Sequence, residues 1–303
     1  MTRHMLKLMD YTGEEIIEIL NLADQLKYER AHGIAHPHLK GKKLGMIFQK
    51  SSTRTRVSFE VGMYELGGYA LFLSSHDLQI GRGEPVEDTA RVLSRYLDGI
   101  MIRTFAQKEV EDLAKYGSIP IINGLTDDYH PCQALADLMT IRERKGSLEG
   151  LKLAYIGDGN NMVNSLIVGG LKTGMHVAVA SPAGYEPKAE IMEWAKGTGR
   201  FAFTNDVREA AAGADVVYTD VWASMGQEGE AAKRREAFQG VYQINGKLME
   251  LTKEDCMVQH CLPAHRGEEI TAEVFEAHAD EIFDEAENRL HAQKALMVKL
   301  MKD

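Results

Sequence analysis

The chain has 303 residues, of which 44% are hydrophobic and 26% are charged, a balance that is typical of a globular protein. Its 35 Lys and Arg against 45 Asp and Glu give a formal net charge of −10. This deficit of cations argues against a broad nucleic-acid surface, so we expect no nucleic-acid partner. At roughly 100–200 residues per domain, the length predicts two domains.

Membrane attachment and disulfide bonding are not expected either. No run approaches the ~18 consecutive apolar residues of a spanning helix, and the first ten residues lack the apolar core of a signal peptide. Cys132, Cys256 and Cys261 are odd in number and have no CxxC spacing, which indicates neither a disulfide framework nor a thiolate zinc site. We therefore expect a cytoplasmic protein.

Short apolar runs that suit buried strands recur along the chain and alternate with helical patterns. One such pattern is Val57, Val61 and Tyr64, closed by Gly67 and Gly68. The alternation predicts the α/β class, with two doubly wound parallel-sheet domains of four strands each. The expected strands are residues 44–48, 69–73, 99–102 and 119–122 in the first domain, and residues 151–156, 176–180, 215–219 and 256–260 in the second.

The domain boundary is placed near residue 135. We expect residues 1–135 to form the first domain and residues 136–287 the second, with residues 288–303 a helix that returns to the first domain. In open α/β sheets, ligands bind beyond the carboxyl ends of the strands. The segments that follow the strands are therefore the candidates for chemistry.

After the strand at residues 44–48, the segment Ser52–Arg56 leads directly into a helix. It carries three hydroxyls and two arginines within five residues. A helix N-terminus favours an anion, and the planar fork of Arg54 can bind two phosphate oxygens at once. An ordinary helix cap uses one hydroxyl, so this segment favours a phosphate-like ligand over capping alone.

Other strand ends carry polar residues whose roles stay open on the residues alone. Arg103 ends a buried apolar run. Its side chain either lies at the same edge of the sheet as Ser52–Arg56 or extends to solvent. His130 and Gln133 are three apart and can share a helix face, although each alone is more often structural. Asp220 suits a substrate ammonium or caps a turn. Cys261 lies at a strand end, but no recognisable His and Asp spacing makes it a nucleophile.

The segment Gly157–Met162 resembles a dinucleotide-binding loop but departs from that motif. Met162 replaces its third glycine, and the next strand ends in Ser181 and Pro182, where a ribose-binding acid is expected. An NAD-dependent dehydrogenase is therefore only the alternative from a different class.

Four segments together resemble the aspartate/ornithine carbamoyltransferase superfamily over essentially the whole chain, and the last two resemble its ornithine carbamoyltransferase branch. They are Ser52–Arg56, His130–Gln133, Asp220–Gly226 and His260–Ala264. The resemblance implies transfer of the carbamoyl group of carbamoyl phosphate to the side-chain amine of L-ornithine, giving L-citrulline and phosphate in arginine metabolism. It also implies an active site in the cleft between the two domains, no cofactor or metal, and a homotrimer or a multiple of trimers.

The resemblance also implies individual roles. The first domain would bind carbamoyl phosphate and the second ornithine, while Gln79 would lie in a loop that reaches the neighbouring subunit's site. The catalytic residues would be Arg103, His130, Asp220 and Cys261. Carbamoyl phosphate would contact Ser52, Thr53, Arg54, Thr55, Gln79, Arg103, His130, Gln133, Cys261, Leu262 and Arg289, and ornithine would contact Asn161, Asp220, Ser224 and Met225.

Within the superfamily, putrescine carbamoyltransferase is the alternative, and aspartate or N-acetylornithine enzymes are less favoured. Putrescine has neither an α-carboxylate nor an α-amine. The presence of Asp220 and Ser224–Gly226, which the resemblance assigns to ornithine, therefore argues against it.

Overall fold

The computed structural model describes residues 2–224 and 226–302. The chain folds into two compact units. Unit 1 comprises Met1–Met139 together with Asn288–Asp303, and unit 2 comprises Thr140–Glu287. Two helices pass from one unit to the other, namely α5 (Pro131–Lys145) and α12 (Ala279–Met301).

The sheet of unit 1 has the four strands expected from the sequence, in the order β2-β1-β3-β4. Every pair of neighbours is parallel. The two central strands are buried almost throughout, as apolar runs in a parallel sheet should be, whereas the edge strand β2 is largely half-exposed. The strands are β1 (Lys43–Phe48), β2 (Tyr69–Ser74), β3 (Gly99–Arg103) and β4 (Ile121–Leu125).

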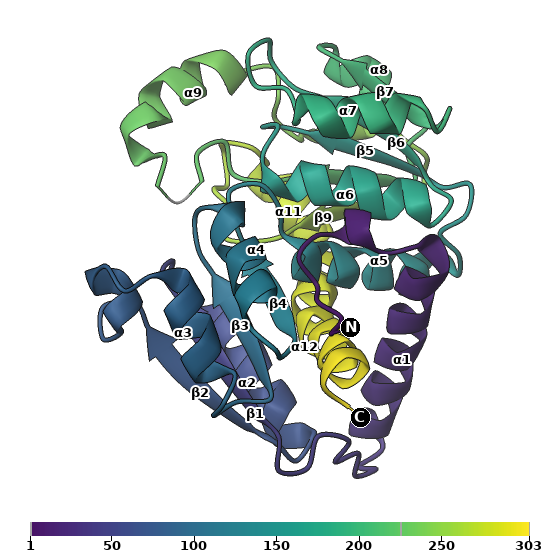
Figure 1. Cartoon of the computed structure of the whole chain (residues 1–303). Coiled ribbons are helices and arrows are strands. Elements are labelled where there is room, and N and C mark those ends of the chain that lie inside the picture. The colour runs from purple at the N-terminus through teal and green to yellow at the C-terminus, as the bar shows by residue number, and fades with distance from the viewer. Residues whose placement is uncertain (1, 225, 303) are drawn as a thin grey trace. The chain divides into compact units, whose positions relative to one another are not determined.

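Helices of unit 1 include α1, whose start is fixed by a capping box. The Thr12 hydroxyl accepts from the Glu15 N–H at 3.2 Å, and the Glu15 carboxylate accepts from the Thr12 N–H at 2.8 Å. Within unit 1, α1 and the end of α12 lie side by side (Figure 1) and are joined by the Lys299–Glu18 ion pair at 2.6 Å. Besides α5 and α12, the helical elements are η1 (Leu8–Asp10), α1 (Gly13–Ala31), α2 (Thr53–Glu65), η2 (Gln79–Arg82), α3 (Val86–Leu93) and α4 (Gln107–Tyr116).

The apolar stripe that predicts α2 does not form its buried face. Val57 is 50% exposed and Tyr64 is 82% exposed. The buried residues of α2 are instead Thr55, Ser58, Phe59, Gly62 and Met63. At Gly62 a Cβ would lie only 3.0 Å from Met297 Cε of α12. Close packing against α12 therefore selects the inner face of α2 and leaves the apolar stripe outside.

The described residues of unit 2 form a five-stranded sheet in the order β7-β6-β5-β8-β9, again with parallel neighbours. The prediction of four strands was wrong here, because β7 was missed. It is a four-residue edge strand, and its largely half-exposed side chains give little periodicity. The strands are β5 (Lys152–Ile156), β6 (His176–Ala180), β7 (Phe201–Thr204), β8 (Val216–Thr219) and β9 (Met257–His260).

Aromatic packing organises the core of unit 2, where Phe238 stacks on Trp222 with ring centroids 5.8 Å apart. Among the helices within residues 2–224 and 226–302, none combines the length and apolar character needed to cross a membrane. The remaining helical elements of this unit are α6 (Asn161–Lys172), α7 (Ala189–Lys196), α8 (Val207–Ala211), η3 (Glu228–Glu230), α9 (Ala231–Phe238), α10 (Gly246–Met249) and α11 (Ala272–Ala277).

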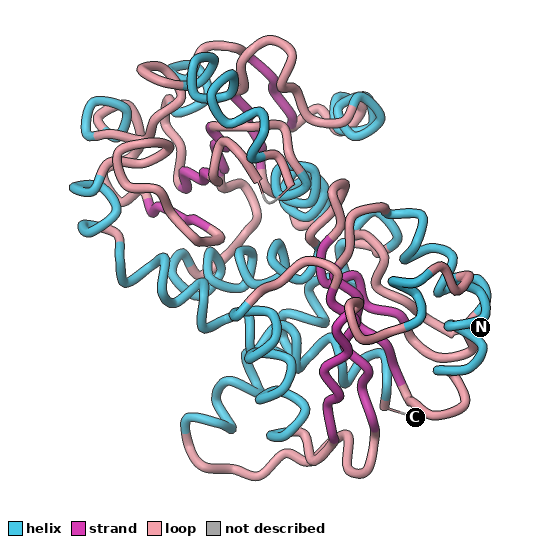
Figure 2. The backbone as a smooth tube through the Cα atoms, turned by 90° about the vertical axis from the view of Figure 1, so that its left-hand side faces the viewer, coloured by secondary structure: helices cyan, strands magenta, loops and turns pink. Residues whose placement is uncertain are grey.

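These sheets confirm the prediction of two parallel-sheet α/β domains. Figure 2 shows the strands as magenta segments framed by helices. In each sheet the strand order reverses at one point, between β1 and β3 in unit 1 and between β5 and β8 in unit 2. Loops leaving the carboxyl ends of such strand pairs diverge and leave room for a ligand.

Gly159 follows β5 for a steric reason. A Cβ at this position would lie 2.2 Å from the carbonyl carbon of Glu186 and 2.4 Å from the nitrogen of Pro187. The Gly159 N–H also donates to the Tyr185 carbonyl at 2.9 Å. The glycine that suggested a dinucleotide loop therefore serves close backbone packing within unit 2.

The substitution Gly159→Ala should lower the free energy of unfolding by about 1–3 kcal/mol, because backbone must move to admit the methyl group. Gly246→Ala is the matched control, since a Cβ there meets nothing within 4 Å. Urea denaturation followed by circular dichroism measures both. Equal stability of the two variants would contradict the steric account.

Candidate active site

The N-terminus of α2 combines an ordinary cap with additional groups that suit an anion. Ser52 is the N-cap, and its hydroxyl accepts from the Thr55 N–H at 3.2 Å. The same hydroxyl donates to the Thr55 Oγ1 atom at 3.1 Å. Thr53 and Arg54 belong to the first turn, so a cation reinforces the positive end of the helix dipole. Ser52 thus caps the helix, and Thr53 and Arg54 add a hydroxyl and a cation that a cap does not use.

Arg289, from the C-terminal helix α12, reaches two residues that the sequence predicted for the same site. Its guanidinium donates to Gln133 Oε1 at 2.5 Å and to Thr55 Oγ1 at 3.2 Å. All three residues are buried. They come from three different helices, so unit 1 brings together predicted residues that are up to 234 positions apart in the chain.

His130 lies among three arginines at this end of unit 1. Burial lowers the pKa of His130 well below its usual value, and the positive charges of Arg289, Arg103 and Arg54 lower it further. The imidazole is therefore neutral near pH 7 and offers one N–H donor and one acceptor. Arg54, Arg103 and Arg289, which we call the arginine cluster, form a positive environment suited to a phosphate dianion.

Two residues that the sequence did not single out hold Arg289 in place. Its Nε donates to Gln293 Oε1 at 2.9 Å, and the Gln293 amide donates to Ser58 Oγ at 2.7 Å. Ser58 in turn donates to the Arg54 carbonyl at 2.6 Å. The four-residue spacing of Arg289 and Gln293 on one helix was the available signal.

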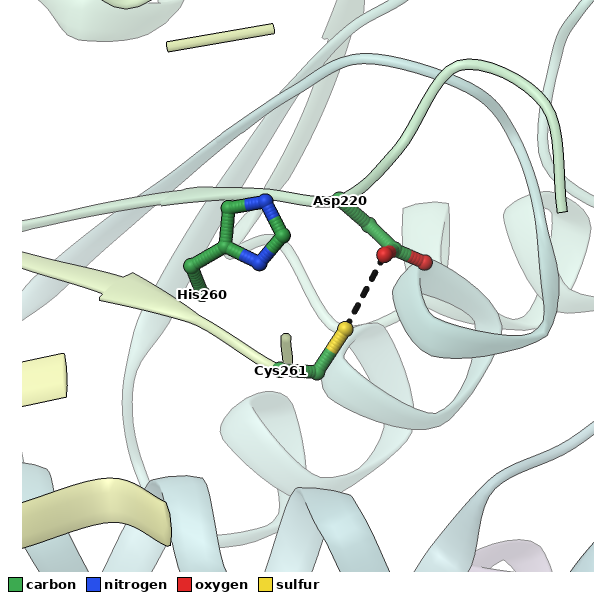
Figure 3. Close-up of side chains that lie close together, drawn as sticks. All are labelled: Asp220, His260 and Cys261. Carbon is green, nitrogen blue, oxygen red and sulfur yellow. Dashed lines mark hydrogen bonds between the residues drawn. The ribbon is translucent and has the colours of Figure 1, made fainter. Parts of the chain in front are cut away.

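In unit 2, Asp220 follows β8 and accepts hydrogen bonds on both carboxylate oxygens. The Cys261 thiol donates to Oδ1 at 3.0 Å, and the Asn160 amide donates to Oδ2 at 2.7 Å. Figure 3 shows the thiol pointing at this carboxylate, with His260 beside them. Asn161, predicted from the resemblance, is the first residue of α6 and follows Asn160 directly. Unit 2 thus brings Asp220 and Cys261 together at the ends of the neighbouring strands β8 and β9.

His260 fixes the backbone around Cys261. The Leu262 N–H donates to His260 Nδ1 at 2.9 Å, so the ring proton lies on Nε2 and donates to Glu269 Oε1 at 3.0 Å. The His260 N–H donates to Glu285 Oε2 at 3.0 Å. Leu262 has a positive φ of 57°, and these contacts stabilise that conformation.

Asp220, His260 and Cys261 place potential metal-ligand atoms within 4.8 Å of one another. Both ring nitrogens of His260 already take part in hydrogen bonds. One carboxylate and one thiol remain, fewer than the three or four protein ligands of zinc sites. The geometry therefore favours hydrogen bonding of a substrate over metal binding.

The remaining predicted residues lie in a short 3-10 helix, in a loop or outside the described chain. Gln79 begins η2 and is exposed, and its carbonyl accepts from the Glu84 N–H at 3.1 Å. Ser224 lies in the loop after β8, where its N–H donates to Gln227 Oε1 at 3.0 Å. Met225, a predicted ornithine contact, lies outside the described residues.

A buried ion pair anchors the loop that carries Ser224. Arg234 on α9 contacts Asp158 at 2.8 Å and donates to the Trp222 carbonyl at 3.0 Å. Burial raises the pKa of Asp158 to about 6, against the opposing effect of Arg234. The sequence analysis missed this pair, because it joins segments after two different strands.

Protein-family comparison finds matches to both halves of the chain. Residues 3–143 match the model described as aspartate/ornithine carbamoyltransferase, carbamoyl-P binding domain. Residues 149–300 match the model described as aspartate/ornithine carbamoyltransferase, Asp/Orn binding domain.

Whole-chain comparisons agree with these matches. The chain is 58% identical to an ornithine carbamoyltransferase of Oceanobacillus iheyensis, over 99% of this chain and 95% of that protein. It is 59% identical to one of Anoxybacillus flavithermus, over 99% and 96%. The structure of ornithine carbamoyltransferase from Pyrococcus furiosus superposes with a TM-score of 0.94 at 53% identity, covering 99% of this chain and 97% of the other.

The lowered pKa of His130 predicts acid sensitivity. Below about pH 6.5 the unfolded chain takes up a proton that the folded chain resists, so stability present above that pH is lost as the pH falls. This loss reaches up to about 1.4 kcal/mol per pH unit. His130→Gln should therefore lose less stability between pH 7.5 and 5.5 than the wild type.

Urea denaturation at the two pH values measures this difference. His176→Gln, at an exposed position on β6, is the control and should follow the wild type. The same loss in the His130 variant as in the wild type would show that His130 binds protons equally well in both states.

Proposed function

Because this chain belongs to the aspartate/ornithine carbamoyltransferase family, we propose that it is an ornithine carbamoyltransferase. It transfers the carbamoyl group of carbamoyl phosphate to the side-chain amine of L-ornithine, giving L-citrulline and phosphate. The observation that carries this proposal is the nearly full-length match to relatives that bear that name. We further propose that the reaction takes place in the cytoplasm and serves arginine metabolism.

Unit 1 is proposed to bind carbamoyl phosphate. The phosphate lies at the N-terminus of α2, against Ser52, Thr53, Arg54 and Thr55, where the positive end of the helix dipole and a cation meet. The arginine cluster supports this role because it concentrates positive charge in a chain of net charge −10. The carbamoyl end is bound by Arg103, His130, Gln133 and Arg289.

Unit 2 is proposed to bind ornithine. Asp220 receives the side-chain amine, supported by its place after β8 and by the Cys261 thiol that contacts it. Asn161, Ser224 and Met225 bind the α-amino and α-carboxylate groups. Cys261 and the Leu262 carbonyl contact the reacting carbamoyl group, in a backbone conformation that His260 stabilises.

The chemistry requires an uncharged amine. Its nitrogen forms the new bond to the carbamoyl carbon, the bond from that carbon to the phosphate oxygen breaks, and phosphate leaves with the electron pair. The nitrogen then gives up a proton to the phosphate or to water. Arg103 and His130 donate to the carbonyl oxygen as negative charge develops, and each such donor contributes roughly 10²–10³ in rate. Carbamoyl phosphate is already activated, so we propose that no cofactor or metal is needed.

The position of the neutral His130 suits this role. A protonated imidazole beside three arginines would add unwanted positive charge, whereas the neutral ring still donates through its remaining N–H. Arg54 stabilises the departing phosphate, and alignment of two bound reactants supplies much of the remaining acceleration.

A substrate series tests the proposal directly. Citrulline should form from ornithine and carbamoyl phosphate, while putrescine, N-acetylornithine and aspartate should each react at least about 10²-fold more slowly. Putrescine lacks both α groups, N-acetylornithine has its α-amine blocked, and aspartate has no side-chain amine to meet Asp220. Colorimetric detection of the ureido product and of phosphate measures both products. Faster turnover of putrescine than of ornithine would select the alternative enzyme of the same superfamily.

We also propose a homotrimer or a multiple of trimers, with the exposed apolar surface of unit 1 as the interface. This surface comprises Val57 and Tyr64, which lie seven residues apart on one side of α2, and Phe72 on the edge strand β2, whose ring contacts Arg56 of α2. A second copy of the chain is the proposed occupant, since such clusters on a protein surface usually bind another protein. Gln79 follows β2 and is proposed to reach the neighbouring subunit's site.

The double substitution Val57→Glu and Tyr64→Glu should convert the assembly to monomers, because two carboxylates would be buried without partners. Sedimentation equilibrium measures the mass. Tyr28→Glu, at an exposed aromatic residue of α1, is the control and should leave the assembly intact. An unchanged mass of the double variant would exclude this surface as the interface.

A further inference from the structure

We propose that Asn160 is a positioning residue that orients the Asp220 carboxylate toward the ornithine amine. The inference rests on the proposed function, because it concerns the amine site of that reaction. The Asn160 amide donates to Asp220 Oδ2 at 2.7 Å, the shortest hydrogen bond described for that carboxylate. Nothing in the motifs quoted from the sequence assigns a role to this residue, which precedes the predicted ornithine contact Asn161.

The direction of the Asn160 side chain is fixed by the cap of α6. Its Oδ1 atom accepts from the Met162 N–H at 2.9 Å and from the Val163 N–H at 3.3 Å. The Tyr155 hydroxyl donates to the same oxygen at 3.3 Å. Because three donors meet the oxygen, the NH₂ end must point the other way, toward Asp220. The cap of α6 therefore determines that the Asp220 carboxylate meets the NH₂ group of Asn160 and not its oxygen.

Asp220 is held from three directions. Asn160 binds one carboxylate oxygen, while the Cys261 thiol and the Val221 N–H bind the other at 3.0 Å and 2.8 Å. Asn160, Val221 and Cys261 follow β5, β8 and β9, and β8 is hydrogen-bonded to β5 on one side and to β9 on the other. These three donors hold the carboxylate in one orientation and occupy three of its roughly four lone-pair sites, so about one is left for an amine.

This orientation matters because a carboxylate can accept a proton or bind an amine only along its lone pairs. A rotated Asp220 would still be negative and would still attract the ammonium form of ornithine. It would not hold the neutral amine in line with the carbamoyl carbon, and misplacement of a reacting group is costly in rate. The Asn160 side chain bonds to Asp220 through its NH₂ group and to the start of α6 through its oxygen, so it acts through Asp220.

Two substitutions separate this role from simple capping. Ser and Asp are both good N-cap residues, so Asn160→Ser and Asn160→Asp should retain the start of α6. Ser is too short to reach Asp220, and an ionised Asp has no donor, so the hydrogen bond to the carboxylate is lost in the Ser variant and, once both carboxyl groups are ionised, in the Asp variant. The other titratable groups around Asp220, namely Cys261, His260, Tyr155 and Asp158, stay unchanged in both.

Steady-state kinetics with both substrates varied is the experiment. We expect kcat/KM for ornithine to fall roughly ten- to a hundredfold, as for loss of a hydrogen bond to a charged group, with KM for carbamoyl phosphate changed by less than about twofold. The melting temperature should stay close to that of the wild type. Asn160→Asp should also need a higher pH for half-maximal kcat than the wild type, because two adjacent carboxylates resist losing both protons.

Asn245→Asp is the matched control. Asn245 is the N-cap of α10, where its Oδ1 accepts from the Leu248 N–H at 3.1 Å, and the substitution adds the same charge to a helix cap in the same unit. Its kinetics and pH profile should match those of the wild type.

Two results would overturn the inference. One is kcat/KM for ornithine within about twofold of the wild type in both Asn160 variants. The other is an equal loss of kcat/KM toward both substrates together with a lowered melting temperature, which would indicate a structural role.

If the wild type forms no citrulline, the proposed function fails instead. Crystal structures of Asn160→Ser and the wild type then decide the positioning role, since an unrotated Asp220 carboxylate would refute it and a rotated one would support it.

Discussion

The parallel direction of the strands is the constraint on which the rest of the structure depends. Every strand pair described in either sheet is parallel, so the carboxyl ends of each sheet share one edge. The order of strands reverses between β1 and β3 and between β5 and β8, where the following loops diverge. In the first pair, Ser52–Thr55 follow β1 and Arg103 is the last residue of β3, and in the second pair Asn160 follows β5 and Asp220 follows β8. The strand order thus brings the candidate site residues of each unit together from distant parts of the chain.

The two units use opposite electrostatics at these edges. Unit 1 holds the arginine cluster, and Arg289 contacts the neutral oxygens of Gln133, Gln293 and Thr55, which orient the guanidinium without cancelling its charge. Unit 2 presents the Asp220 carboxylate, bonded to an amide and a thiol. An anionic phosphate and a cationic amino-acid side chain would therefore be selected by different units.

Sequence periodicity predicted much of this arrangement, because buried parallel strands are apolar runs and the residues that follow them are easily found. It failed for β7, which is short and lies at an edge, and for the inner face of α2, where contact with α12 decides burial. Arg289 entered only through the family resemblance. Asn160 was missed because its role depends on a hydrogen bond between strand ends, which no local pattern records. Gln293 lies four residues from Arg289, but its bond to Ser58 joins two helices and cannot be read from that spacing.

A crystal structure with carbamoyl phosphate and norvaline, the ornithine analogue without the side-chain amine, tests the central claim most directly. The account predicts phosphate oxygens within hydrogen-bond distance of the N–H groups at the start of α2 and of Arg54. It predicts the amino acid at the carboxyl ends of β5 and β8, beside Asn161 and Asp220. Binding of either molecule away from its strand pair would contradict the account.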